Sequence, residues 1–255
     1  IVDFCHRVGI TKKDNVIEMS ALEHSVREKL DESSARKMVV LRPLKVILTN
    51  FDESKDEILT AKNHPNRTEL GERKISFAKE LYIERDDFME DAPEKFFRLK
   101  PGEEVRLRYA YIIRCDEVIK NSDGEIIELH CSYDPDTRSG TGTSDKKVKG
   151  TIHWVSVKHS FSAEIRLYDR LFSEPDPGTS DDIMLTINPK SLEVVSARLE
   201  NSLLKTKPGE TFQFERNGYF CSDHKDHNSD APTYNRIITL RDSWAKIEKQ
   251  ARNQQ

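Results

Sequence analysis

The sequence has few apolar residues, few cysteines and no long hydrophobic run. Of its 255 residues, 36% are hydrophobic and 34% are charged, compared with about 25% charged residues in an average soluble domain. The longest apolar runs, Met38–Leu41 and Tyr109–Ile113, fall far short of the roughly 20 residues that a membrane-spanning helix needs. A composition this polar favours half-buried antiparallel sheets over a doubly wound parallel sheet, whose strands are apolar on both faces.

The charge balance and the cysteines argue against further classes of protein. With 41 basic and 45 acidic residues the net charge is −4, so any nucleic-acid site must be a local basic patch. The four cysteines are scattered without a C-x-x-C spacing, which argues against a disulfide scaffold and for a reducing, cytoplasmic compartment. Asp3, His6 and Arg7 stand where a signal peptide would be apolar. Because Ile1 already lies in a helical pattern, we expect the chain to be part of a longer protein.

Two short helical patterns open the chain. The first covers residues 1–8, whose apolar side chains share one helical face, and Gly9 is a natural end. The second starts at a predicted capping box of Ser20 with Glu23. Its apolar residues recur at helical spacing through residue 30, and residues 35–37 are expected to add at most one more turn.

From Met38 to about Trp244 the pattern changes to short alternating segments that are separated by turn residues. We therefore expect a mainly β fold with a small N-terminal α part, in which the β region forms one or two barrels.

A strand pattern at residues 104–113 carries the most informative polar side chains. Val105 and Leu107 are expected in the core, because they alternate with charged residues. Arg106 and Arg108 would then lie on the outer face, roughly 7 Å apart, with guanidinium forks suited to phosphates and base edges. If they bind RNA, they should lack strong carboxylate partners. The alternative is a solvated outer face on which acids such as Glu103 neutralise both arginines.

Aromatic residues lie in the same stretch of the chain. Residues 95–114 hold six basic and two acidic residues together with Phe96, Phe97 and Tyr109. Bases of single-stranded RNA stack on exposed aromatic rings, although core packing is the commoner role of phenylalanine.

No motif predicts catalysis or a cofactor. Cys221, His224 and His227 have a metal-like spacing, but a structural zinc site needs four ligands and no second pair lies nearby in sequence. The glycine-rich Ser139–Thr143 lacks the Gly-Lys-Ser/Thr ending of a phosphate loop, and His153 has no nucleophile beside it. We expect no metal site and no catalytic residue in this chain.

Several strings of residues are similar to one family. They are VKGTIHWVS at Val148–Ser156, AEIRLYDRLF at Ala163–Phe172 and FQFERNGYFC at Phe212–Cys221, with further matches in the same order from Phe4 to Lys246. The chain resembles the C-terminal half of bacterial-type glutaminyl-tRNA synthetases. The resemblance implies the end of a helical subdomain and the two β-barrels that hold the anticodon loop. It also implies that the catalytic domain, with its HIGH and KMSKS motifs, its ATP and its Mg²⁺, lies outside this chain.

On this basis we expect two antiparallel β-barrels, the second inserted in the first. The expected division is 1–37 for the end of the helical subdomain, 38–95 with 175–246 for the proximal barrel, 96–174 for the distal barrel and 247–255 for a tail.

The resemblance also implies site residues. Those expected to bind the anticodon are Arg36, Asn66, Arg98, Arg106, Arg108, Gln213 and Arg216. Those expected near the tRNA backbone are Lys12, Lys13 and Lys95. Lys95 and Phe97 stand where the family often has Gln and Lys, so the pocket for the middle base is expected to differ here.

The implied partner is tRNA-Gln, bound by a monomer, with no DNA and no membrane. Two alternatives stay open. One is the corresponding region of a glutamyl-tRNA synthetase, which shares the architecture but usually lacks the Gly-x-Ile-His-Trp-Val-Ser string. The other is a non-catalytic β-barrel protein that binds RNA.

Overall fold

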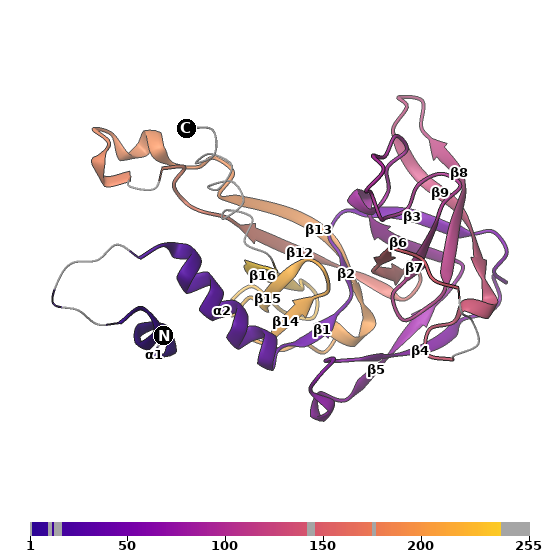
Figure 1. The fold of residues 1–255 in the computed structure, drawn as a ribbon, viewed down its shortest axis with the longest axis horizontal. Helices are drawn as coiled ribbons and strands as arrows, with labels where there is room; N and C mark the ends of the chain where they lie inside the picture. The colour runs from indigo at the N-terminus through magenta and orange to yellow at the C-terminus, as the bar shows by residue number, and fades with distance from the viewer. Residues whose placement is uncertain (1, 10–11, 13–16, 142–145, 175–176, 241–255) are drawn as a thin grey trace.

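A computed structural model describes residues 2–9, 12, 17–141, 146–174 and 177–240 of the chain. Two helices come first, α1 at Val2–Val8 and α2 at Met19–Ser33. Strands then build two seven-stranded sheets, called sheet A and sheet B below, and a separate hairpin (Figure 1). None of the described helices is long and apolar enough to cross a membrane.

The first helix ends as predicted, and the second begins earlier than predicted. Gly9 follows α1 with a φ of +75°, and its N–H donates to the carbonyl of Cys5 at 3.1 Å. Helix α2 starts at Met19, so Ser20 lies inside the helix, where its hydroxyl donates to the carboxylate of Glu18 at 3.2 Å. The predicted capping box at Ser20 is therefore wrong.

Helix α2 lies beside sheet A (Figure 1). Its apolar face is half-buried rather than buried. Arg27 fixes the helix to the sheet, because its Nε donates to the carbonyl of Thr239 at 2.9 Å.

Sheet B curls into a nearly closed barrel. In spatial order its strands are β10 (Thr151–Ile152), β7 (Glu104–Leu107), β8 (Ile112–Lys120), β9 (Ile126–Asp134), β3 (Pro43–Leu48), β6 (Glu80–Glu84) and β11 (Trp154–Ser156). The two edge strands, β10 and β11, are separated in sequence by His153 alone. The two edges of the sheet must therefore lie next to each other.

The hairpin of β4 (Glu57–Lys62) and β5 (Glu72–Phe77) covers the interior of sheet B. Leu59, Ile75 and Phe77 belong to the same core as the barrel strands. Phe77 meets Trp154 edge to face with 5.1 Å between ring centroids. The hairpin thus completes the core that the curled sheet begins.

Sheet A has its own core. In spatial order its strands are β1 (Ala35–Lys37), β14 (Thr211–Phe214), β15 (Gly218–Ser222), β16 (Thr233–Thr239), β12 (Ser160–Tyr168), β13 (Leu192–Glu200) and β2 (Val39–Val40). Phe214 stacks on Phe220 at 4.3 Å, and both belong to this second core with Tyr234. Strands β12 and β13 form the long ribbon of Figure 1.

The expectation of two antiparallel barrels is corrected in two respects. Both sheets are mixed, because β3 pairs parallel with β9 in sheet B, and β1 and β12 pair parallel with β14 and β16 in sheet A. Only sheet B approaches closure. Residues 35–37 are also a strand, not a helical turn. Local turn signals identify neighbouring antiparallel strands, but a parallel pair joins segments that are distant in sequence and leaves no such signal.

The chain forms β1 and β2 of sheet A, then builds sheet B, and returns to sheet A at β12. The chain thus passes from sheet B to sheet A between Ser156, the end of β11, and Ser160, the start of β12. The division into inserted domains stays a prediction, and the tail 247–255 lies outside the described residues.

Candidate nucleic-acid interface

The alternation that was predicted at residues 104–108 is present. Val105 and Leu107 in β7 are fully buried, whereas Arg106 and Arg108 are half-buried. The strand ends at Leu107, and Tyr109 follows with a φ of +62°. Its ring still contacts the barrel core. The two arginines therefore lie where strand β7 meets the turn before β8.

The two arginines have different partners. Arg106 donates to the carbonyls of Thr137 at 2.8 Å and Lys146 at 3.5 Å. No carboxylate of the described residues forms an ion pair with it. Arg108 instead forms an ion pair with Glu215, whose side chain is 3% exposed. The expectation that both guanidiniums would lack strong carboxylate partners is therefore wrong for Arg108. The local sequence did not reveal this pair, because Glu215 follows β14 of the other sheet.

Arg98 and Arg216 meet at a single buried carboxylate. Asp87 is 1% exposed. One of its oxygens lies 2.6 Å from Arg216 Nη2 and 3.4 Å from Arg98 Nε, and Arg216 also pairs with the other oxygen. Arg216 has a φ of +67° in the turn between β14 and β15, and its Nη1 lies 3.2 Å from His153 Nδ1. Two of the predicted site residues thus share one anchor between the sheets.

Arg36 and Gln213 also come together, as partners across the parallel strands β1 and β14. Asp31 accepts from Arg36 at 3.3 Å and from the hydroxyl of Tyr219 at 3.0 Å. Gln213 is 7% exposed, and its amide donates to the same Tyr219 hydroxyl at 3.2 Å. Burial and the Asp31 carboxylate raise the pKa of Tyr219 to about 12, so Tyr219 remains a donor at neutral pH.

The remaining predicted residues do not join these groups. Asn66, Lys95 and Lys12 are exposed, and Asn66 uses its backbone N–H to bind the ring of His64 at 3.2 Å. Lys13 lies outside the described residues. These residues stay predicted contacts on the basis of the resemblance alone.

A cleft of about 590 Å³ lies beside the predicted site. Most residues of the segment 94–104 line it, although Lys95 does not, together with residues 147–150 and Arg114. Phe97 is 51% exposed, with Lys149 Nζ 5.4 Å from its ring centroid, and the guanidinium of Arg98 lies 5.7 Å from the ring of Phe96. Exposed rings can stack an unpaired base, and the cations beside them attract its phosphate.

Gly150 explains how the two walls of the cleft approach each other. A Cβ atom at this position would lie 2.2 Å from the backbone oxygen of Phe97, so only glycine fits. The strand-like sequence around Gly150 gave no sign of this contact, since Phe97 lies far away in the chain.

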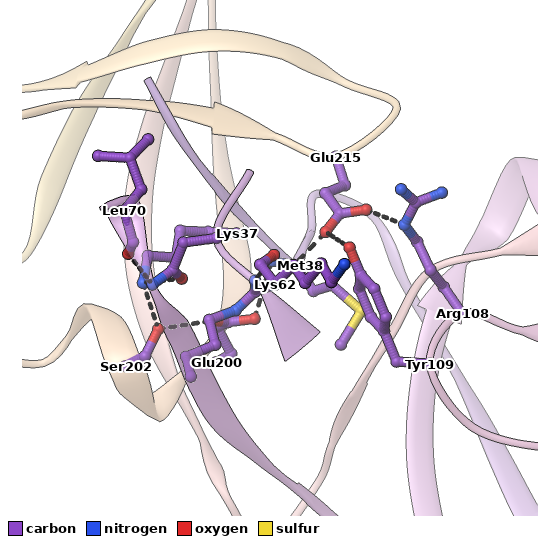
Figure 2. A network of polar contacts seen from close by, with 11 residues as sticks. Lys37, Met38, Lys62, Leu70, Arg108, Tyr109, Glu200, Ser202 and Glu215 are labelled. Atoms are coloured by element: carbon purple, nitrogen blue, oxygen red, sulfur yellow. Dashed lines mark hydrogen bonds and ion pairs between the residues drawn. The ribbon is translucent and has the colours of Figure 1, made fainter. Parts of the chain in front are cut away.

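A buried polar network joins the sheets behind Arg108 (Figure 2). Glu215 accepts from the hydroxyl of Tyr109 at 2.9 Å and lies 3.3 Å from Arg73 Nη2. Arg73 Nε lies 2.6 Å from Glu200, which also accepts from the N–H of Met38 at 2.9 Å. The sequence pattern predicted neither carboxylate, because each binds residues that are distant in the chain.

This network keeps Arg108 charged and Tyr109 neutral. Burial lowers the pKa of Arg108, but the Glu215 carboxylate outweighs burial and raises it above its ordinary value. Burial, together with the same carboxylate, raises the pKa of Tyr109. Both groups are therefore held as donors toward Glu215.

The metal-like spacing near the end of the chain has a structural role. The ring of His227 is held between the backbone of Thr233 and the carbonyl of Thr206, each at 3.1 Å. Within the described part of the chain, no group of three or more His, Cys, Asp and Glu residues could hold a metal ion.

Comparison with known proteins gives two matches to family models. Both models describe the anticodon-binding domain of the class I tRNA synthetases for glutamate and glutamine, and they match residues 34–134 and 151–223.

Curated relatives match nearly the whole chain. The chain is similar to the proteins named glutamine–tRNA ligase of two bacteria. It is 47% identical over 250 residues to that of Vibrio campbellii and 50% identical over 243 residues to that of Tolumonas auensis. These alignments cover 98% and 95% of this chain, but only 45% and 44% of the relatives. The chain therefore spans less than half the length of the curated relatives that it matches. It belongs to the anticodon-binding domain family of the class I tRNA synthetases for glutamate and glutamine, and corresponds to the C-terminal anticodon-binding region of bacterial glutamine–tRNA ligase.

Proposed function

We propose that this chain binds the anticodon loop of tRNA-Gln within an enzyme that joins glutamine to that tRNA. The observation that carries the proposal is the cleft beside β7. It combines an exposed Phe97 with five cationic side chains, among them Arg98 and Lys149, which outnumber the three carboxylates of the lining. Anticodon bases are unstacked and single-stranded, and such bases bind to aromatic faces and to side-chain donors.

The surroundings of the predicted site residues indicate two different roles in binding. Arg98 and Arg216 are fixed by Asp87, and Arg36 is fixed by Asp31. Arginine forks held in this way can read acceptors on a base edge. Lys12 and Lys95 are exposed and would contact phosphates. Such contacts add electrostatic attraction without sequence preference.

The reaction itself belongs to the part of the relatives that this chain does not cover. ATP and Mg²⁺ would bind there. A cytoplasmic location and a monomeric state are part of the same proposal.

A glutamyl-tRNA synthetase region and a non-catalytic RNA-binding barrel are the competing functions. The curated relatives quoted above carry the name glutamine–tRNA ligase, which favours tRNA-Gln over both alternatives.

Filter binding with tRNA-Gln, tRNA-Glu and an unrelated tRNA distinguishes the three functions. We expect the tightest binding for tRNA-Gln. Preference for tRNA-Glu would support the glutamyl alternative. Equal binding of all three tRNAs would support general RNA binding and contradict the proposal.

A further inference from the structure

Arg108 is the only predicted anticodon residue that reaches the buried network between the sheets, among the residues that the structure describes. Its side chain is 34% exposed, and its partner Glu215 is 3% exposed. Figure 2 shows the contact with Glu215 at the Nε of Arg108 and no dashed contact at its two terminal nitrogens. One edge of the fork is therefore bound inside the protein, and the other edge faces outward.

The carboxylate behind Arg108 is itself held in place. Tyr109 donates to Glu215 at 2.9 Å, and Arg73, with its side chain 4% exposed, contacts Glu215 at 3.3 Å and Glu200 at 2.6 Å. The guanidinium of Arg73 also donates to the carbonyl of Lys62 at 2.9 Å. Glu215 cannot rotate away from Arg108 without leaving buried charged groups unpaired, which is costly.

The charges of this pair limit what Arg108 can bind. A phosphate that approached the outer edge of the fork would be attracted by Arg108 and repelled by Glu215 behind it, and a carboxylate about twice as far away as the guanidinium removes about half of that attraction. A base edge carries no net charge. Its acceptor atoms gain the hydrogen bonds of the fork and suffer far less from the carboxylate.

We propose that Glu215 is a specificity-determining positioning residue, which orients Arg108 and neutralises its charge so that Arg108 reads an uncharged base edge rather than a phosphate. The inference rests on the proposed anticodon function. The acceptor pairs of guanine or cytosine are the chemistry that the outer edge of the fork fits.

The test measures two properties of binding in the natural full-length protein. The first is discrimination between tRNA-Gln and variants with one anticodon base replaced. The second is the slope of log K against log salt concentration. On a single strand, this slope becomes shallower by about 0.7 for each phosphate that the protein no longer neutralises.

For Arg108→Met we expect discrimination at one anticodon position to fall by roughly 5- to 150-fold, with the salt slope unchanged. For Glu215→Gln we expect the slope itself to change. The uncompensated Arg108 then attracts phosphate, so the slope steepens by about 0.7 while discrimination at the same position falls. In the double variant the slope should return to that of the wild type, because Glu215 acts through Arg108.

Lys147→Met is the matched control. Lys147 is an exposed cation of the cleft beside β7, so its removal should make the slope shallower by about 0.7 and leave discrimination unaltered. If Glu215→Gln fails to fold, Arg108→Met still decides whether Arg108 reads a base, on which the role of Glu215 depends. A shallower slope with equal loss for all anticodons would overturn the inference while the proposed function stands. If neither Arg108→Met nor Lys147→Met changes tRNA binding, the proposed function itself fails.

Discussion

At the scale of single residues, Gln213 and Lys12 give the clearest contrast between a proposed base contact and a proposed phosphate contact. Gln213 is 7% exposed and fixed by Tyr219, whereas Lys12 is exposed. We expect Gln213→Ala to weaken discrimination at one anticodon base by about 1–3 kcal/mol. Binding of tRNA variants that differ only at that base measures the effect.

Lys12→Ala serves as the contrast. It should weaken the binding of all tRNAs alike and lower the salt dependence of binding by the equivalent of about one phosphate contact. If both variants lose affinity uniformly across anticodons, Gln213 does not read a base.

At the scale of elements, Glu84 links three segments. It accepts from the N–H groups of Leu41 and Arg42, which follow β2, at 2.7 and 3.0 Å. It also accepts from Asn217, before β15, at 3.1 Å. Burial raises its pKa, but the hydrogen bonds from His153 and from these backbone N–H groups outweigh burial and lower the pKa to about 2.

This lowered pKa predicts how stability depends on pH. Because the folded-state pKa lies below the ordinary value of 4.5, the carboxylate stabilises the fold fully above pH 4.5, and this contribution is lost as the pH falls toward 2. We expect Glu84→Gln to cost on the order of 3 kcal/mol at neutral pH. Denaturant unfolding of the wild type and of Glu84→Gln, measured at a series of pH values, should show that their difference in stability shrinks as the pH falls. A difference that does not change with pH would contradict the assignment.

Gly150 gives a second test at this scale. For Gly150→Ala we expect a loss of stability of about 1–3 kcal/mol, because the new Cβ would lie 2.2 Å from the carbonyl oxygen of Phe97. The segment that carries Phe97 must then move, and tRNA affinity should fall with it. Thermal unfolding and filter binding measure the two effects. An alanine variant as stable as the wild type would show that the two walls of the cleft do not approach this closely.

Sequence patterns predicted local features and missed distant ones. The alternation in β7 correctly buried Val105 and Leu107, because a period of two depends on neighbouring residues only. Residues 35–37 were misassigned, since their strand depends on a parallel partner at residues 212–214. The partners of Arg108 and Arg216 were missed for the same reason: Glu215 and Asp87 come from other elements of the fold.

At the scale of the whole molecule, the chain matches less than half of each quoted relative. It carries neither of the adenylate-forming motifs of the class I synthetases. We therefore expect the isolated chain to show no glutamine-dependent exchange between ATP and pyrophosphate. Clear exchange from the purified chain would contradict the assignment to the anticodon-binding region.

The central claim is that this region recognises an anticodon. An anticodon exchange on one tRNA body tests it most directly, since the body and its phosphates stay the same. The account predicts that tRNA-Gln with a foreign anticodon binds at least about 10-fold more weakly than tRNA-Gln, with each mismatched base costing about 1–3 kcal/mol. An unrelated tRNA that receives the tRNA-Gln anticodon should bind more tightly than before. Equal affinity for tRNA-Gln and its exchanged form would contradict the account.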